Sequence, residues 1–194
     1  MPSSYGNADK RQRIVETAYE LFKRFGFHAT GIDRIIAEAD VAKMTMYRHF
    51  PSKVDLIVEV LSCRAERFER QLDRLMEQFE TAEQKIASIF DWYERWFQTP
   101  DFHGCLFAHA LAEFGDSLHP VFKAVAAQKN ALRLRMRQIL EEAMPADRAD
   151  GVAAALLMLL EGATLMAQMG QGDTAIREAK KTAVNLVAPP KPPQ

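Results

Sequence analysis

The chain has 194 residues, of which 48% are hydrophobic, and this suits one or two compact units with packed cores. Its two cysteines, Cys63 and Cys105, are too few for the disulfide framework of a secreted protein and are consistent with a reducing compartment. The formal net charge of −1 does not exclude a nucleic-acid partner, because phosphate contact depends on where the charges lie.

Apolar residues recur at helical spacing along nearly the whole chain. A first stripe, from Ile14 to Phe25, ends at Gly26. A long helix from Ser52 to about Phe79 contains no Gly or Pro, so we expect it to be a stiff connection between the segments on either side of it. We find no pattern typical of a strand, repeat or glycine-rich phosphate loop, and the predicted fold class is all-α. Further helices are expected at about 86–97, 106–114, 120–145, 147–169 and 173–187.

No segment is expected to cross a membrane. The most apolar stretch, residues 152–169, is interrupted by Glu161, Gly162, Thr164 and Gln168. The N-terminal residues lack the apolar run that a secretion signal requires. We therefore expect a soluble, cytoplasmic protein with no membrane partner.

The most informative segment is 30–53, TGIDRIIAEADVAKMTMYRHFPSK, which predicts two short helices joined by a tight turn. Ala37 is small enough to let the helices cross closely, and Asp40 tolerates the left-handed conformation of such a turn. This is the pattern of a helix-turn-helix, whose second helix fits the major groove of DNA. Hydrogen-bond donors crowd that second helix: Lys43, Thr45, Tyr47, Arg48 and His49.

Capping residues frame the motif. Thr30 with Asp33 predicts a capping box at the start of the first helix, and Ser52 with Asp55 predicts one at the start of the helix after the motif. Ala42, which precedes the second helix, has no side chain that can cap it, and this costs about 1 kcal/mol relative to a capping residue.

These residues resemble the N-terminal domain of the tetracycline-repressor (TetR) family of transcriptional regulators. The family pattern runs close to T-x-x-x-I-A-x-x-A-G-V-S-K-G-T-L-Y-x-H/Y-F-x-S-K-x-x-L, and the resemblance covers roughly the first third of the chain. This sequence departs from the pattern in the turn and at the start of the second helix. Asp40 replaces the usual glycine, Ala42 the serine, and residues 44–46 read Met-Thr-Met in place of Gly-Thr-Leu.

The resemblance implies a homodimer that binds a near-palindromic operator in double-stranded DNA through two recognition helices. At the matching positions Thr45, Tyr47, His49 and Lys53 are expected to contact phosphates, while Arg34, Lys43 and Met44 are better placed for base edges. The complete predicted set of DNA-binding residues is Thr30, Arg34, Lys43, Met44, Thr45, Tyr47, Arg48, His49 and Lys53.

The resemblance also implies a C-terminal helical domain that binds a small-molecule effector and dimerises through its last two helices. We predict residues 1–55 as the DNA-binding domain, 56–188 as the ligand-binding and dimerisation domain, and 189–194 as a disordered proline-rich tail. An apolar or aromatic effector is expected, with release from the operator as its effect, and no cofactor or metal. The candidate ligand residues are Phe79, Trp92, Trp96, Cys105, Phe107, His109, Glu113, Phe122, Met158, Glu161 and Met166.

Cys105, His109 and Glu113 recur at a spacing of four, which places them on one face of a helix. A transition-metal site, a thiol that senses oxidants or electrophiles, and a simple buried cysteine all fit this spacing. Catalysis is disfavoured, because groups along one helix do not converge on a substrate atom. A helical interaction protein that does not bind DNA is the remaining alternative to a regulator.

Overall fold

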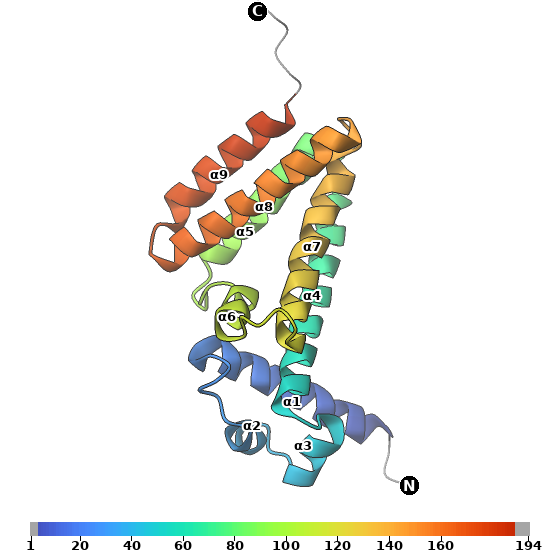
Figure 1. Ribbon diagram of the computed structural model, residues 1–194, viewed down its shortest axis with the longest axis vertical. Helices are drawn as coiled ribbons and strands as arrows, with labels where there is room; N and C mark the ends of the chain where they lie inside the picture. The colour runs from blue at the N-terminus through green and yellow to red at the C-terminus, as the bar shows by residue number, and fades with distance from the viewer. Residues whose placement is uncertain (1–3, 189–194) are drawn as a thin grey trace, which may run out of the picture. The chain divides into compact units, whose positions relative to one another are not determined.

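The computed structural model describes residues 4–188, with side chains described from residue 8 onward, and this part of the chain forms nine helices and no strand (Figure 1). The predicted tail, 189–194, lies outside the described residues. The all-α prediction is confirmed. The helices are α1 (Ser4–Phe25), α2 (Ile32–Glu38), α3 (Lys43–His49), α4 (Lys53–Met76), α5 (Ala82–Phe97), α6 (Leu106–Glu113), α7 (Pro120–Leu140), α8 (Ala146–Gln168) and α9 (Gly172–Val187).

The helices form two compact units. The first contains the described residues up to Arg67 together with Cys105–Ala126, and the second contains Phe68–Gly104 together with the described residues from Ala127 onward. Helices α4 and α7 contribute to both units. The predicted boundary at residue 55 therefore coincides with no boundary of either unit. The physical reason is that Phe107 and Ala110 of α6 are buried in the same core as the helix-turn-helix.

The first unit is built around the apolar stripe of α1. That stripe packs against one buried face each of α2, α3 and α4, which is the arrangement that the spacing of apolar residues predicts. The rings of Phe22 and Phe27 pack in a tilted arrangement with their centroids 4.9 Å apart. The largest fully buried side chains of this core are Phe22, Phe27, Ile14, Ile35, Met46, Leu56, Ile57 and Leu61.

The turn between α2 and α3 takes the form that the sequence predicts. Asp40 has a φ of 49°, in the left-handed region, and its N–H donates to the carbonyl of Ala37. Arg13 of α1 donates to the carbonyl oxygen of Asp40 at 3.0 Å, so α1 also fixes this turn. Ala42 occupies the N-cap position of α3 without a side-chain cap, as its residue type requires.

One of the two predicted capping boxes is wrong. The N-cap of α2 is Gly31, with no side-chain cap, because the hydroxyl of Thr30 donates to the carbonyl of Gly26 at 2.7 Å instead. The other box is confirmed at the start of α4. Ser52 N donates to Asp55 Oδ2 at 2.9 Å, and Asp55 N donates to Ser52 Oγ at 3.2 Å.

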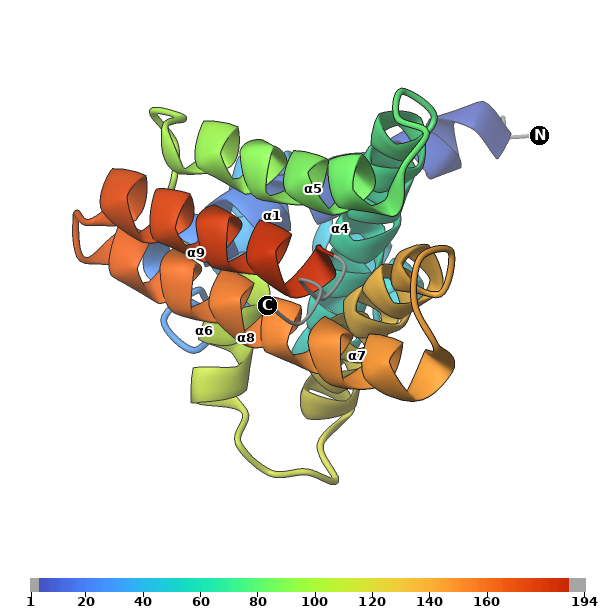
Figure 2. The ribbon, with the colours of Figure 1, turned by 90° about the horizontal axis from the view of Figure 1, so that it is seen from above.

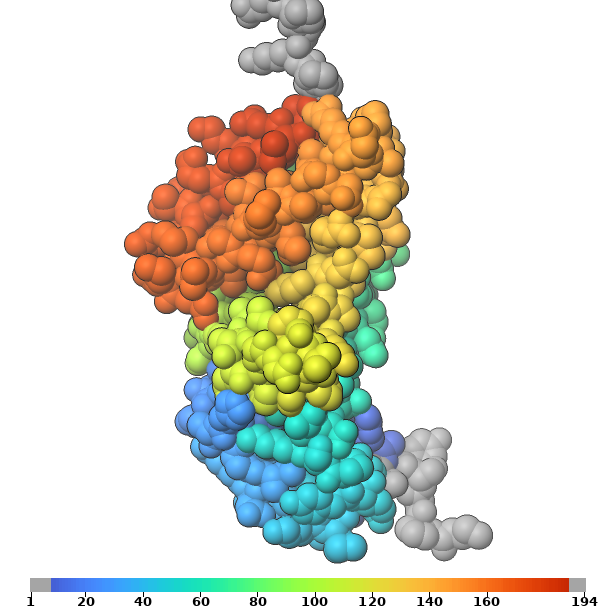
Figure 3. Space-filling view, viewed as in Figure 1, coloured from blue at the N-terminus to red at the C-terminus, as the bar shows by residue number. Residues whose placement is uncertain are grey.

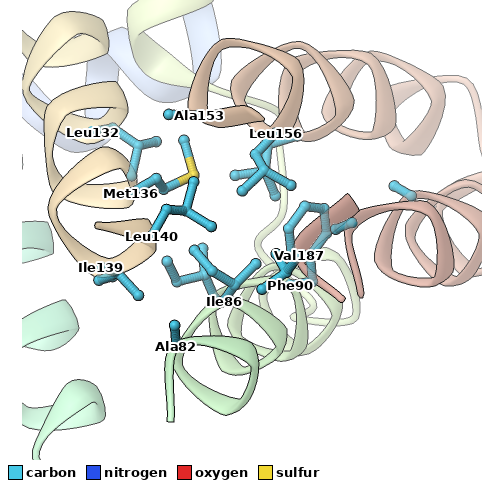
Figure 4. Packing of buried hydrophobic residues seen from close by; sticks show 14 of the residues in the cluster. Ala82, Ile86, Phe90, Leu132, Met136, Ile139, Leu140, Ala153, Leu156 and Val187 are labelled. Atoms are coloured by element: carbon cyan, nitrogen blue, oxygen red, sulfur yellow. The ribbon is translucent and has the colours of Figure 1, made fainter. Parts of the chain in front are cut away.

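The second unit packs α5, α8 and α9 along one another (Figure 2). Figure 4 shows side chains of α5, α7, α8 and α9 meeting in its core, among them Phe90, Met136, Leu156 and Val187. Helix α5 begins in a capping box formed by Thr81 with Gln84, a T-x-x-Q pattern that the sequence displays.

Helix α8 corrects one expectation. By length and composition it is apolar enough to cross a membrane, with a mean hydropathy of 1.5 over an 18-residue window. Its interruptions do not lower the hydropathy as far as expected. However, one face of α8, including Leu156, Leu160 and Ala163, is buried against the neighbouring helices of the second unit. A helix that packs in the core of a protein can be as long and as apolar as a membrane-spanning helix. The length and composition of α8 are therefore weak evidence for a membrane span.

Candidate nucleic-acid interface

Helix α3 has one face exposed to solvent, which carries both polar and apolar side chains, and an opposite face that is buried in the core. Lys43, Met44, Tyr47 and Arg48 are exposed, and their spacing places them on one side of the helix. Met46 is fully buried on the opposite side. The exposed fraction of Met44 is 82%, an unusual value for a large apolar side chain, so this face carries an apolar contact group among its donors.

Two predicted base readers lie at the surface and make local contacts. Lys43 pairs with Asp33 of α2 at 3.2 Å, with both side chains well exposed, so the pair is weak and easily exchanged for another partner. Arg34 pairs with Glu38 at 2.8 Å and lies over the Phe25 ring at 4.0 Å. Arg34 must give up these contacts, at least in part, to reach a base.

Lys53 lies at the start of α4 and is half-buried. Its Nζ donates to the carbonyl of His28 at 3.3 Å, which ties α4 to the turn between α1 and α2. Burial lowers the pKa of Lys53, and the negative charge of Glu113 opposes this shift. The position retains the first-turn N–H groups of α4, which favour a phosphate.

Thr30 is the predicted DNA contact that does not fit its surroundings. Its side chain is fully buried, and its hydroxyl donates to Gly26 and Leu21 carbonyls. The side chain therefore holds the α1–α2 turn and is not accessible to DNA. The family pattern contains this threonine, but a pattern does not say whether a residue contacts the operator or stabilises the domain.

His49 is also constrained by the fold. Its Nε2 is buried without a hydrogen-bond partner, although the side chain as a whole is half-buried. The pKa of His49 is lowered first by burial and then by the charges of Arg48 and Arg11. The neutral imidazole is therefore favoured in the folded protein, so any phosphate contact begins from a neutral side chain.

Both parts of the chain match known families. Residues 14–60 match bacterial regulatory proteins of the tetR family, and residues 82–183 match the tetracyclin repressor-like C-terminal domain. The chain belongs to the TetR family. It is a DNA-binding transcriptional regulator, and the family consists of regulators and not of enzymes. The alternative of a helical interaction protein that does not bind DNA is therefore excluded.

Three relatives indicate how far the similarity extends. A TetR-family regulator from Streptomyces coelicolor has a crystal structure that superposes with a TM-score of 0.86, at 27% identity, over 93% of this chain and 95% of the relative. An uncharacterized HTH-type transcriptional regulator of Mycobacterium tuberculosis is 25% identical over 185 residues, 91% of this chain and 93% of the relative. The HTH-type transcriptional repressor KstR of Mycolicibacterium smegmatis is 35% identical over 71 residues, 37% of this chain and 35% of the relative.

The predicted ligand residues of this TetR-family regulator divide between the two units. The first unit contains Cys105, Phe107, His109, Glu113 and Phe122, because α6 and the start of α7 fold with the helix-turn-helix. Phe107 is buried in the core of that unit. No single pocket within either unit is lined by the whole predicted set. The second unit contains Phe79, Trp92, Trp96, Met158, Glu161 and Met166.

Within the second unit, Met158 and Glu161 are placed differently from the prediction. The exposed fraction of Met158 is 68%, so this side chain lies on the outer face of α8. Glu161 accepts from Lys129 at 2.6 Å, so its carboxylate already forms an ion pair within the protein. Met166 is half-buried on α8, and Phe79 is half-buried beyond the end of α4.

Trp92 and Trp96 belong to a continuous row of aromatic rings, which we call the aromatic row. Phe68 of α4 contacts Trp92 edge to face at 5.0 Å, Trp92 contacts Trp96 at 5.8 Å, and Trp96 contacts Phe102 edge to face at 5.0 Å. Most of these side chains are half-buried and retain solvent-accessible surface. The row consists of Phe68, Trp92, Tyr93, Trp96, Phe97 and Phe102.

One end of the aromatic row reaches an open cleft of about 510 Å³ at the turn between α8 and α9. Phe97 lines this cleft as well as the row. Gln98, Asp173 and Arg177 add polar groups to the lining. None of the eleven predicted ligand residues lines this cleft, because its shape depends on the α8–α9 turn, which no spacing in the sequence reveals.

The cysteines offer different environments. Cys63 of α4 donates to Glu59 at 3.4 Å, and burial followed by this carboxylate raises the pKa of its thiol, so the reactive thiolate is disfavoured. Cys105 is half-buried at the N-cap of α6. Neither cysteine forms a disulfide. Among the described residues, no group of three or more His, Cys, Asp or Glu side chains is placed to hold a metal ion.

The sequence-based prediction missed residues that complete the DNA-binding unit. Arg13 supports the helix-turn-helix turn, and Glu113 accepts two backbone hydrogen bonds from the α1–α2 turn. Arg13 lies in a basic cluster before the motif, which was a usable indication of its importance. Glu113 lies 60 residues beyond Lys53 and offers no local indication of this contact.

Proposed function

We propose that this regulator is a homodimeric repressor that binds a near-palindromic operator and releases it when a small aromatic or apolar compound binds. The observation that carries the proposal is the exposed face of α3, with Lys43, Met44, Tyr47 and Arg48 presented together by a matched helix-turn-helix. The similarity of the DNA-binding region to a relative named as a repressor supports the sign of regulation.

In this proposal Thr45, Tyr47 and Lys53 hold phosphates, while Lys43 and Met44 face base edges. Phosphate contacts fix the orientation of the protein, and contacts at base edges supply the sequence preference. An apolar side chain such as Met44 favours the 5-methyl group of thymine. Arg48 and His49 lie beside these residues on α3. Arg34 contacts DNA once its ion pair with Glu38 is broken.

We assign the dimer interface to α8 and α9. The two helices lie side by side in Figure 3. An exposed apolar stripe runs along α8 and continues to the residue that follows it. The exposed fractions of Met158, Leu165 and Met169 are 68%, 59% and 62%. Gly162 lies in the same stripe, and a Cβ added to it would meet no atom beyond its chain neighbours and the backbone of its own helix within 4 Å, which leaves room for a second helix to approach closely. A two-fold dimer formed in this way matches a palindromic operator.

We assign effector binding to the aromatic row and the cleft that it joins at Phe97. Half-buried aromatic rings offer stacking surface, and the polar groups of the cleft would orient the ligand. The chain has only two tryptophans, and both belong to the row. Intrinsic fluorescence therefore reports directly on this site.

We further propose that α4 couples the two sites. It runs without interruption from Lys53 to Met76, and it supplies Lys53 to the DNA-binding unit and Phe68 to the aromatic row. A typical coupling free energy of about 1–3 kcal/mol would weaken operator binding from several-fold to about a hundred-fold. We place this activity in the cytoplasm, where a bacterial regulator meets DNA.

The test is to select genomic DNA fragments on the purified protein at stated salt and then to screen metabolites for release of the selected operator. Tryptophan fluorescence should change with each releasing compound, and Trp92→Phe should reduce that change while leaving operator binding intact. Saturating operator must weaken ligand binding by the factor by which ligand weakens operator binding. A compound that binds equally well with and without operator would contradict the release mechanism.

Thiol sensing by Cys105 is the second candidate, favoured by its half-buried position at the start of α6, which leaves part of the side chain accessible to an oxidant or electrophile. The test is Cys105→Ser, with Cys63→Ser as the matched control. Loss of operator release by diamide or hydrogen peroxide in the Cys105 variant alone would favour this candidate over a small-molecule effector.

A further inference from the structure

The turn between α1 and α2 is held by a residue that lies outside the helix-turn-helix. Glu113 ends α6, and its Oε1 accepts from the N–H of Phe27 at 2.8 Å while its Oε2 accepts from the N–H of His28 at 2.6 Å. In return, His28 Nε2 donates to the main-chain carbonyl of Glu113 at 3.0 Å. Three hydrogen bonds thus join α6 to this turn, two of them to a carboxylate, which is the stronger kind of acceptor.

The turn is shaped to receive this carboxylate. Gly26 has a φ of +80°, and a Cβ added to it would lie 2.9 Å from Glu113 Oε1, so a side chain at this position would displace the carboxylate. Phe114, the residue after Glu113, packs its ring against His28 at 4.7 Å. The turn and the end of α6 are therefore matched in backbone conformation, hydrogen bonding and ring packing.

The same turn is bonded to the predicted phosphate-binding lysine. The carbonyl of His28, whose N–H is bonded to Glu113, accepts from Lys53 Nζ at 3.3 Å. The Thr30 hydroxyl bonds the carbonyl of Gly26, so side chains from three different segments fix successive backbone groups of this turn. Glu113 is the one of these three that follows the matched DNA-binding region, which ends at residue 60.

We propose that Glu113 is a positioning residue for DNA binding. Its carboxylate fixes the α1–α2 turn, and through the carbonyl of His28 it fixes Lys53 at the first turn of α4. Glu113 acts through Lys53 and does not itself touch DNA. The proposal rests on DNA binding by the first unit and on the proposed phosphate contact of Lys53. Glu113, which the sequence analysis predicted as a ligand residue, is thereby given a role in DNA binding.

The substitution Glu113→Gln distinguishes positioning from electrostatics by the sign of its effect. Glutamine has a single acceptor oxygen, and its NH₂ group would face the second backbone N–H. We expect operator affinity to fall about tenfold. Loss of a negative charge alone would instead leave DNA affinity unchanged or raise it. The matched control is Glu16→Gln, which removes an exposed charge of α1 in the same unit and should not weaken binding.

Lys53 provides the readout that a general loss of stability would not give. If Glu113 acts by placing Lys53, then Lys53→Ala should cost less affinity in the Glu113→Gln background than in the wild type. Glu113→Asp restores a carboxylate, one methylene shorter, and should recover part of the affinity. Independent, multiplying effects of the two substitutions would overturn the proposal, as would a Glu113→Gln protein that binds operator as tightly as the wild type.

Hydrogen exchange of the wild-type protein keeps the proposal testable even if Glu113→Gln does not fold. The N–H groups of Phe27 and His28 should exchange at least about tenfold more slowly than unbonded exposed amides, without operator and with it. Exchange at the rate of an open loop would overturn the proposal. A wild-type protein that selects no DNA would overturn the proposed function with it, whereas tight binding by Glu113→Gln would overturn this inference alone.

Discussion

The α2–α3 segment and the aromatic row carry the two proposed binding activities, and they are built in opposite ways. Segment 30–53 is contiguous, so the periodicity of a short helix fixes which of its side chains share a face. The aromatic row takes Phe68 from α4, Trp92 and Trp96 from α5, and Phe102 from the following loop. Trp92, Tyr93, Trp96 and Phe97 share α5, but Phe68 and Phe102 join them only because separate segments of the chain pack together. A contiguous site is therefore readable from sequence, and a site assembled by packing is not.

The largest effects are expected from introducing a charge into α8, and they should differ between its buried face and its exposed face. Leu160 is fully buried, so Leu160→Glu should prevent folding of the second unit, because burying an unpaired carboxylate costs several kcal/mol (~3–5). Leu165 is largely exposed, so Leu165→Glu should fold normally but give a monomer. Operator affinity should then fall by roughly a hundredfold, the usual gain from linking two binding modules.

Sedimentation and circular dichroism separate these outcomes. Gln138→Glu, which adds the same charge to an exposed position of α7, is the control and should remain a dimer. A Leu165→Glu protein that is still dimeric would place the interface on other helices.

The second effect tests how the first unit holds phosphate. Lys53→Ala should weaken binding to all DNA sequences and reduce the slope of log affinity against log salt by about 0.9, the value for one lost phosphate contact. Lys123→Ala removes an exposed lysine of the same unit outside the motif and should leave the slope unchanged. The measurement is fluorescence anisotropy over a range of salt concentrations, and equal slopes for the two variants would remove Lys53 from the interface.

A smaller effect tests base reading by Met44. Replacing a contacted thymine of the selected operator by uracil removes one methyl group and should reduce affinity about fourfold, the equivalent of about 0.8 kcal/mol. Met44→Ala should abolish the difference between thymine and uracil at that position, whereas Lys43→Ala should keep it. If no thymine of the operator responds in the wild-type protein, Met44 does not read a methyl group.

The smallest effect concerns His49. Because burial lowers its pKa in the folded protein, the unfolded state takes up a proton near pH 6.5 that the folded state does not. Stability is therefore fully present above about pH 6.5 and declines as the pH falls below that value. His49→Asn should remove this part of the pH dependence in urea unfolding, and Arg48→Gln should reduce it. An unchanged profile in His49→Asn would assign the dependence to other groups.

Individual residues show why the site was only partly predictable. Asp40 was predicted in a left-handed turn and has a φ of 49°. This prediction succeeded because the backbone conformation at a turn depends on the preference of the residue itself. Thr30 has the residue type of a helix cap, yet its hydroxyl turns inward to Gly26. Glu113 was predicted to orient a ligand and instead bonds the α1–α2 turn. Residue type and spacing describe what a side chain can do, and its surroundings select among the options.

The sequence by itself determined that the described chain is helical throughout, and it determined the turn at Asp40 and the exposed face of α3. These features depend on hydrogen bonds and side-chain spacings within a few residues of the chain, so the local sequence is enough to predict them. Most helix ends lie within a few residues of the prediction, but α1 begins at Ser4, ten residues before the predicted stripe, and α7 ends at Leu140, five residues before the predicted end. Only the tertiary structure decided that α6 folds with the helix-turn-helix, that Leu160 is core while Leu165 is surface, and that six aromatic rings form one row. These outcomes depend on which apolar faces cover one another, and that is settled by contacts between residues far apart in the chain.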